Sequence, residues 1–168
     1  MLQSRLARWR VPLGFACTAI SMVLARPTPL TLAIGGAICV IGEAVRVWAS
    51  GHIEKGREVT RSGPYRLVPH PLYLGSAIIG LGFVVAARSV WAAVLVIVYL
   101  AATLLAAMRS EEATLDARFA DEYQAYRAGR AEPVDRVFSF ARLSANREYR
   151  AIAGLALGMG LLYLRSLL

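Results

Sequence analysis

Apolar residues along this chain gather into five blocks that are separated by polar segments. The blocks cover residues 11–25, 30–49, 72–87, 90–108 and 151–164. A helix needs about 20 apolar residues, at 1.5 Å rise per residue, to cross the hydrocarbon core of a bilayer. The pattern therefore predicts an all-α integral membrane protein with five transmembrane helices in a bundle, built as a single domain over residues 1–168.

The polar segments differ in length, and this difference predicts how the spans are connected. Residues 26–29 and 88–89 are short enough to predict two antiparallel helical hairpins, one from spans one and two and one from spans three and four. The segments 50–71 and 109–150 are long. Within the second, residues 109–127 predict an amphipathic helix over the mouth of the bundle, because apolar side chains recur with helical spacing at Leu115, Phe119, Tyr123 and Tyr126. A weaker interfacial helix is predicted over residues 138–149.

The charge distribution predicts an orientation. The net charge is +8, with 19 Lys and Arg. Three cations precede the first block, five surround the second connection and eight follow the fourth block, so 16 lie on one side and three on the other. Positive charge favours the cytoplasmic side, which predicts a cytoplasmic N-terminus and cytoplasmic long segments in the inner membrane of a prokaryote. The basic charge therefore indicates topology, and no nucleic-acid partner is expected.

Composition also limits the chemistry. The chain is 57% hydrophobic with a mean hydropathy of +0.52. Its two cysteines, Cys17 and Cys39, lie inside apolar blocks without a Cys-x-x-Cys spacing, so they are predicted to be small buried side chains. No metal site is predicted.

The stretch from residue 63 to residue 75 is the most informative polar segment. Its three prolines forbid a continuous helix, because each lacks an N–H and disfavours helical backbone in the preceding residue. Tyr65, Arg66, His70 and Tyr73 stand on this frame directly before an apolar block. The segment predicts a rigid, polar, aromatic-lined loop at the membrane boundary.

Two carboxylate groups add candidate chemistry. Glu111 and Glu112 follow span four and emerge on the same side as the proline-rich loop, so one of them is expected to face it. Glu43 and Arg46 lie in the inner half of span two, either as a self-contained ion pair or as groups facing a partner or cavity. His52 is expected to be a loop residue.

Several motifs together resemble the isoprenylcysteine carboxyl methyltransferase family, whose relatives include phospholipid N-methyltransferases. The matching pieces are Gly-Pro-Tyr-Arg at 63–66, His-Pro-x-Tyr-x-Gly at 70–75, Glu-Glu-x-x-Leu at 111–115 and Phe-x-x-x-Tyr-x-x-Tyr at 119–126. The resemblance implies a membrane enzyme that uses S-adenosylmethionine from a cytoplasmic pocket, while a lipophilic substrate enters from the bilayer.

The resemblance also implies roles for individual residues. The candidate catalytic residues are His70, Arg109 and Glu112: Arg109 is the cation nearest the position of the family's substrate-side arginine, and His70 and Glu112 are the candidate bases for a hydroxyl acceptor. The candidate cofactor contacts are Val59, Thr60, Gly63, Tyr65, His70, Pro71, Tyr73 and Glu111. The chain departs from the family pattern at Pro69 and Ala107, where relatives carry arginine.

The methyl acceptor stays open at this point. The resemblance favours the carboxylate of an isoprenylcysteine-like compound, which needs no general base. A phenolic or polyketide lipid hydroxyl, with a pKa near 10, would need one, and phospholipid N-methylation is a further alternative. A non-catalytic membrane scaffold or small-ligand carrier is the rival outside enzymes, and the sequence favours no oligomeric state.

Overall fold

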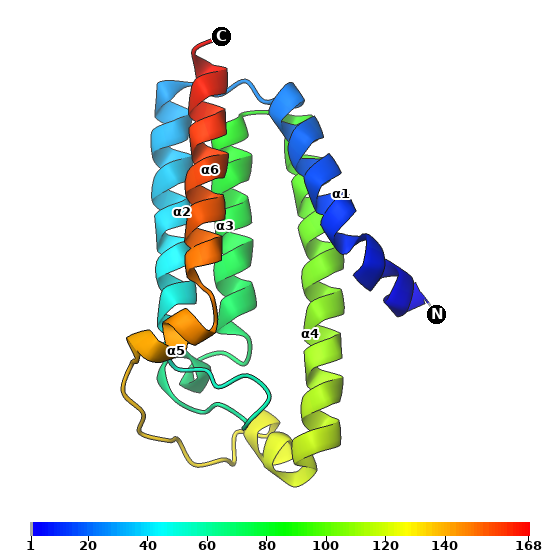
Figure 1. The fold of residues 1–168 in the computed structure, drawn as a ribbon, viewed down its shortest axis with the longest axis vertical. Helices are drawn as coiled ribbons and strands as arrows, with labels where there is room; N and C mark the ends of the chain where they lie inside the picture. The colour runs from blue at the N-terminus through cyan, green and yellow to red at the C-terminus, as the bar shows by residue number, and fades with distance from the viewer. Residues whose placement is uncertain (1) are drawn as a thin grey trace.

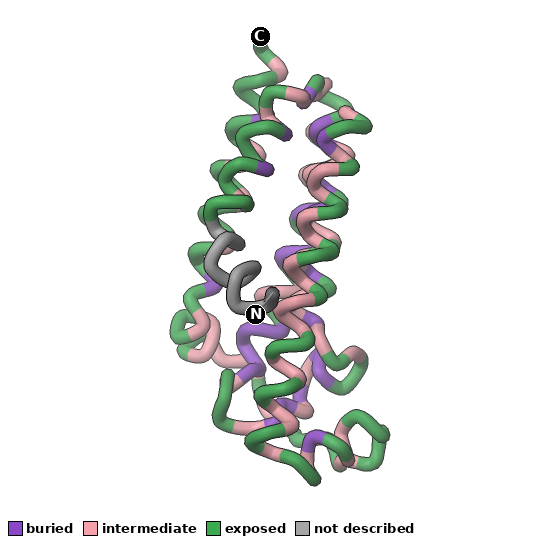
Figure 2. Tube along the Cα trace, turned by 90° about the vertical axis from the view of Figure 1, so that its right-hand side faces the viewer, coloured by how far each residue is buried: buried purple, intermediate pink, exposed green. Residues whose placement is uncertain are grey.

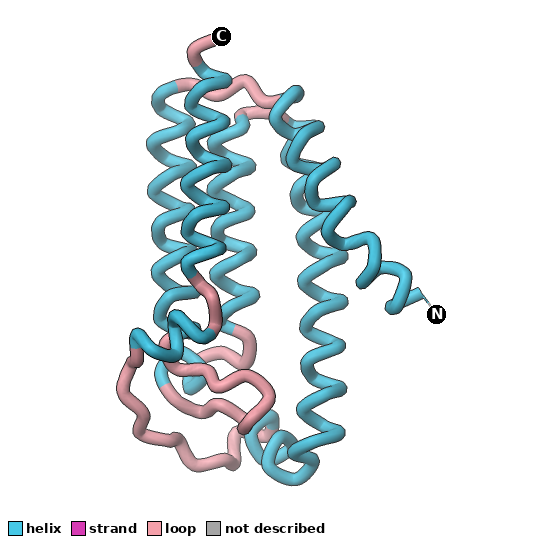
Figure 3. The backbone as a smooth tube through the Cα atoms, viewed as in Figure 1, coloured by secondary structure: helices cyan, strands magenta, loops and turns pink. Residues whose placement is uncertain are grey.

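The computed structural model describes residues 2–168, and the side chains from residue 12 onward. Helices and loops account for all of this described part, without a strand (Figure 3). The elements are α1 (Leu2–Leu24), α2 (Pro29–Ser50), the 3-10 helix η1 (Gly63–Arg66), α3 (Pro71–Ala87), α4 (Val90–Arg127), α5 (Phe140–Ala145) and α6 (Tyr149–Ser166). The prediction of an all-α protein is confirmed.

The long helices run up and down, so both long polar segments lie at one end of the bundle (Figure 1). The turns α1–α2 and α3–α4 lie at the other end together with the C-terminus. We call the first end the loop end and the second the turn end. The predicted short connections are present, because α2 starts at Pro29 and α4 starts at Val90.

The hairpin prediction is only half right. α3 and α4 pack together, whereas the main contacts of α1 are with α4, and α2 makes its main contacts with α3 (Figure 1). Helices α2 and α3 lie close together because glycines of each helix contact the backbone of the other. A Cβ added at Gly42 would lie 2.7 Å from the Gly75 carbonyl oxygen, and one added at Gly82 would lie 2.6 Å from that of Gly35. Small residues of this kind allow helices to approach closely within membranes.

Two helices, α2 and α4, are long and apolar enough to cross a bilayer, while α3 and the stretch Pro12–Leu24 of α1 are shorter apolar helices. The structure therefore supports a membrane protein. The predicted count of five spans stays a prediction. Exposed positions cover much of the helical surface in Figure 2, and many carry large apolar side chains such as Val40, Leu81 and Val98. Cys17 and Cys39 are buried, as predicted.

The helices in the long polar segment 109–150 differ from the two that the sequence predicts. Residues 109–118 continue α4 past the bundle, and the residues after Phe119 form a second helical piece that packs against the loop segments. The backbone leaves helical geometry once, at Phe119 (φ −132°, ψ 23°). This break redirects the last two turns, which carry Tyr123 and Tyr126. The second interfacial helix is shorter than predicted, because α5 covers only Phe140–Ala145.

Candidate functional site

The proline-rich loop is irregular, as its sequence predicts, with Pro64 and Tyr65 buried and Leu67 exposed. Its first part forms the single turn η1, and Pro71 is buried where α3 begins. Gly63 has a φ of +54°, and a Cβ there would lie 2.6 Å from Cγ of His52. His52 is thus a buried support beneath the loop, with its Nδ1 2.9 Å from the Trp48 carbonyl oxygen. Glycine is required at position 63 because the backbone there is left-handed and because a side chain would clash with the His52 ring.

A cavity lies between this loop and the far part of α4. Its walls come from residues 53–60, from η1, from the end of the loop and from the α4 face that carries Glu111. The lining residues are Ile53, Glu54, Lys55, Gly56, Glu58, Val59, Thr60, Tyr65, Pro69, His70, Glu111, Leu115, Tyr123 and Tyr126. Two segments that are distant in sequence therefore form one polar and aromatic site at the loop end.

The cavity is narrow. It has about 40 Å³ of open space, whereas pockets for cofactor-sized ligands hold roughly 300–1,000 Å³. A ligand of that size can enter only if a wall moves outward. The helix break at Phe119 lies within the α4 wall, after Glu111 and Leu115 and before Tyr123 and Tyr126, so this is where the helix can bend.

Three contacts hold the end of α4 against the loop. The Tyr126 hydroxyl donates to the Tyr65 carbonyl oxygen at 2.7 Å, and Arg118 donates to the Gly56 carbonyl oxygen at 3.0 Å. Arg61 forms an ion pair with Glu122 at 3.0 Å. Two of these contacts involve exposed groups, which contribute little stability each. Together with the contact between His70 and Glu112, these interactions hold the wall closed.

Tyr65 is buried in the cavity wall, at 7% exposure, and its hydroxyl has no hydrogen-bond partner among the described residues. Burial raises the pKa of Tyr65 far above its usual range, and the nearby Glu111 carboxylate acts in the same direction. The hydroxyl therefore stays protonated as a donor. A buried donor without an acceptor is costly, which marks this position as one where a ligand oxygen is favoured.

His70 and Glu112 form a pair beside the cavity. Nε2 of His70 lies 3.0 Å from Oε1 of Glu112, and the imidazole ring packs against the Tyr73 ring with centroids 5.7 Å apart. Glu111 lines the cavity and has no ion-pair or hydrogen-bond partner in the described part of the chain. The two adjacent carboxylates thus face different surroundings, one the histidine and the other the cavity.

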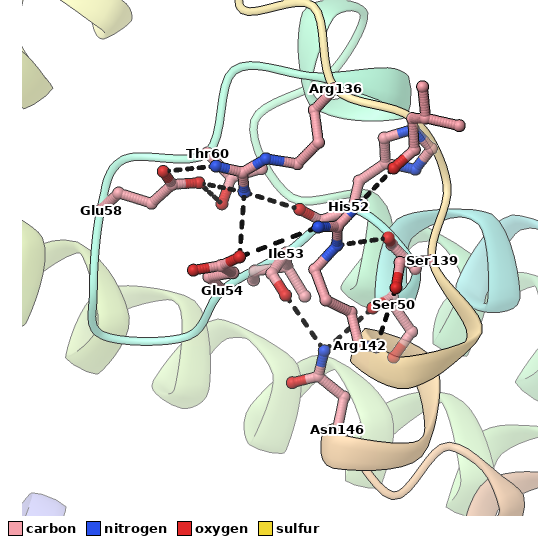
Figure 4. A network of polar contacts seen from close by, with 12 residues as sticks. Ser50, His52, Ile53, Glu54, Glu58, Thr60, Arg136, Ser139, Arg142 and Asn146 are labelled. Carbon is pink, nitrogen blue, oxygen red and sulfur yellow. Dashed lines mark hydrogen bonds and ion pairs between the residues drawn. The ribbon is translucent and has the colours of Figure 1, made fainter.

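A second segment packs against residues 50–66, which lead into the proline-rich loop. Residues 134–146, which we call the strap, run along residues 50–66 and bind their backbone (Figure 4). Arg142 donates to the Gly51 carbonyl oxygen at 2.8 Å, and the Asn146 amide donates to those of Ser50 and Ile53 at 2.9 and 3.1 Å. Arg136 pairs with Glu58 and also donates to the His52 carbonyl oxygen at 3.2 Å. The strap fixes the backbone that carries Val59 and Thr60.

Arg46 of α2 forms an ion pair at the loop end with Glu148, a residue distant in sequence. Arg46 is paired with Glu148 at 2.6 Å and donates to Ser76 at 2.5 Å, while Glu43 is 3.8 Å away. Ser50 donates to the other Glu148 oxygen at 3.0 Å. Of the two sequence interpretations, the pairing of Arg46 with another segment describes the structure better than a self-contained Glu43–Arg46 pair.

Most of the residues predicted for the site gather here. Four of the predicted cofactor contacts line the cavity together with His70, and Gly63, Pro71 and Tyr73 lie in the frame around it. The four lining contacts are Val59, Thr60, Tyr65 and Glu111. Glu112 contacts His70, whereas Arg109 lies in a separate hollow with Ser110, Thr114 and Arg118 and does not line the cavity.

Sequence reasoning did not find Glu58, Arg136 or Glu148. Glu58 stands one residue before the predicted contact Val59, which is a local signal. The other two are single charged residues in a long polar segment, and only their spatial partners reveal a role.

Comparison with known protein families agrees with this geometry. The phospholipid methyltransferase family matches residues 9–122, about two-thirds of the chain and a range that contains the proline-rich loop and Glu111. No curated protein and no solved structure matches the chain significantly. Because the family match covers most of the helical bundle and the cavity, the chain belongs to the phospholipid methyltransferase family, and it is a membrane methyltransferase.

Proposed function

We propose that this protein transfers a methyl group from S-adenosylmethionine to a lipid, and that the transfer takes place at the cavity between the proline-rich loop and α4. The observation that carries the proposal is the cavity itself, which joins the motif residues of the family to the Glu111 carboxylate and the Tyr65 hydroxyl, two groups without a partner among the described residues. A scaffold or carrier would have no need for these groups to converge.

The residues present fit this cofactor. Its ammonium group would be held by the Glu111 carboxylate, and the Tyr65 hydroxyl supplies a donor for a cofactor oxygen. The tyrosine rings in the wall, Tyr65, Tyr123 and Tyr126, suit its sulfonium, since each good cation–π contact contributes roughly 0.5–2 kcal/mol. When bound, the cofactor supplies an electrophilic methyl group on sulfur. The protein then has to align the acceptor and exclude water.

The methyl acceptor that the geometry supports best is one that carries a proton, and the amine of a phospholipid headgroup is the leading example. An ammonium must lose a proton before its nitrogen lone pair can attack the methyl group. If Nε2–H of His70 donates to Glu112, Nδ1 is left as the basic atom that accepts this proton, and Glu112 stabilises the resulting imidazolium.

The second candidate is the carboxylate of an isoprenylcysteine-like lipid, which the sequence motifs favour. A carboxylate is already a nucleophile at neutral pH, so His70 would then only position its neighbours. The spatial pairing of His70 with Glu112 is the observation that favours the proton-bearing acceptor over this one.

The proposed orientation follows from charge. We propose five membrane spans formed by α1, α2, α3, α4 and α6, with the loop end and its cavity in the cytoplasm of a prokaryotic inner membrane. The support is the excess of cations near the loop end. The lipid substrate reaches the cavity from the bilayer.

The proposal can be tested on purified protein in nanodiscs. With labelled S-adenosylmethionine, methylated lipid should form from phosphatidylethanolamine, and the Glu111→Gln variant should lose most of that product. If labelled methyl appears only in prenylcysteine compounds, the second candidate is correct. If no lipid class becomes labelled although the cofactor binds, the proposed transfer is refuted.

A further inference from the structure

Three arginines gather at the turn end of the bundle, away from the proposed active site. Arg26 lies in the α1–α2 turn, Arg88 ends α3 and Arg165 lies in the last turn of α6, and all three line one hollow. Their side chains have no hydrogen-bond or ion-pair partner in the part of the chain that the structure describes. The nearest sequence segments carry no acidic residue either, because residues 1–42, 59–110 and 149–168 contain no Asp or Glu.

The base of this hollow is rigid. The Arg26 N–H donates to the Ala87 carbonyl oxygen at 2.8 Å, which joins the two turns. Beneath it lies the main apolar cluster of the bundle, formed by Ala25, Ala86, Ala87, Ala92 and Leu162. Arg88 adopts left-handed backbone (φ 46°) at the end of α3. The arginine backbones are therefore held in fixed positions by packed elements.

The wall of the hollow is apolar and exposed. Val90 and Trp91 are 77% and 73% exposed, and both line the hollow beside the arginines, as do Val23 and Leu24. The hollow has about 470 Å³ of open space. Tryptophan favours the boundary between headgroups and acyl chains, so guanidinium groups and apolar surface meet here at the depth of a lipid headgroup.

From these observations we propose that the hollow binds the headgroup phosphate of an anionic phospholipid, in the leaflet opposite the candidate active site. Guanidinium groups bind phosphate oxygens through paired hydrogen bonds. Three such groups without an internal carboxylate leave a positive field that a phosphate neutralises, and the exposed Val90 and Trp91 side chains cover the first part of the acyl chains. Cations are scarce at this end, three of 19, which makes their convergence on one hollow informative. The proposal is independent of methyl transfer.

The test measures lipid binding by native mass spectrometry on delipidated protein. The test variant is Arg26→Gln/Arg88→Asn/Arg165→Gln, in which Asn tolerates the left-handed backbone. The matched control is Arg130→Gln/Arg147→Asn/Arg150→Gln, which removes the same charge from exposed arginines without side-chain partners at the loop end. Arg147 is also left-handed, with φ 56°. A third variant with lysine at positions 26, 88 and 165 keeps the charge and serves if the first fails to fold.

Wild-type protein should bind phosphatidylglycerol more tightly than phosphatidylcholine with the same chains. The test variant should lose at least about tenfold of that affinity, given the attraction expected for each basic side chain, and the control should stay within about twofold. The lysine variant should lose less than the test variant. Equal loss in test and control, equal binding of the two lipids by wild type, or equally tight binding of soluble glycerol phosphate would each overturn the proposal.

Discussion

The Arg136 guanidinium binds the Glu58 carboxylate through both terminal nitrogens, with Nη1–Oε1 at 2.5 Å and Nη2–Oε2 at 2.7 Å. This hydrogen bonding raises the pKa of Arg136. Glu58 lines the cavity, and Arg136 lies in the strap, beyond the residues that the family match covers. The site is thus completed by a part of the chain outside the matched region.

The first prediction concerns this pair. Arg136→Lys keeps a charge but loses the paired geometry, and Arg136→Ala loses both. We expect cofactor affinity to fall in the order wild type, Lys, Ala, by about 1–3 kcal/mol for alanine, the usual cost of a lost hydrogen bond to a charged group. Isothermal titration with S-adenosylmethionine measures it. Arg130→Ala is the control, and equal affinities in all four proteins would show that the strap does not shape the cavity.

A second prediction isolates the carboxylate in the cavity. Glu111→Gln should weaken cofactor binding by about 1–3 kcal/mol, because the amide cannot neutralise an ammonium group. Thermal stability should change little, since Glu111 has no partner among the described residues. Glu132→Gln, at an exposed residue between α4 and the strap, is the matched control. Unchanged affinity in Glu111→Gln would remove this residue from the site.

The third prediction distinguishes the two roles of His70. If His70 accepts a proton from the lipid amine, His70→Asn should reduce turnover by about 10²–10⁴-fold while cofactor affinity stays near wild type. Wild-type turnover should also fall on acidification, because a protonated imidazole cannot accept the proton. Rates and affinities measured from pH 5 to 9 check both points. Partial activity with an unchanged pH profile in His70→Asn would indicate positioning alone and favour a carboxylate acceptor.

The fourth prediction concerns Tyr65 and alkaline pH. Burial holds the pKa of Tyr65 well above that of an unfolded tyrosine, so above about pH 10 the unfolded chain releases this proton while the folded chain keeps it. The unfolded state then binds fewer protons, and the free energy of unfolding falls as pH rises.

Tyr65→Phe tests this argument by thermal unfolding in detergent at pH 8 and pH 10.5. The variant should be as stable as wild type or about 1 kcal/mol more stable at pH 8, because an unpaired buried hydroxyl is removed. It should lose less stability than wild type at pH 10.5. It should also bind the cofactor more weakly. A large loss of stability at pH 8 would mean that the hydroxyl has a partner in the folded protein.

The sequence predicts the helical part of this protein well, because apolar blocks and proline–glycine turns are local signals. The apolar blocks predicted to begin at residues 30 and 90 correspond to α2 and α4, which begin at Pro29 and Val90. The pairing of α1 with α4 is not predictable in this way. It depends on which apolar faces complement one another. The close approach of α2 to α3 depends likewise on contacts between distant glycines, such as Gly42 against Gly75.

For the site, residues within motifs were predictable and their supports were not. Tyr65, His70 and Glu111 belong to recognisable spacings and lie together at the cavity. Arg109 is the cation nearest to Ala107, where relatives carry arginine, but it lies about 200° around the helix from Glu111 and lines a different hollow. Arg136 and Glu148 act through contacts with residues 78 and 102 positions away, Glu58 and Arg46, and a single sequence carries no record of such pairs.

The central claim is that S-adenosylmethionine binds between the proline-rich loop and α4. Ultraviolet cross-linking of labelled S-adenosylmethionine to the protein in nanodiscs, followed by tryptic peptide mapping, tests it most directly. The account predicts label in the peptides of residues 58–61, 62–66 or 110–118, reduced by excess unlabelled cofactor and in the Glu111→Gln variant. Competable label confined to peptides from α1, α6 or the turn end would contradict it.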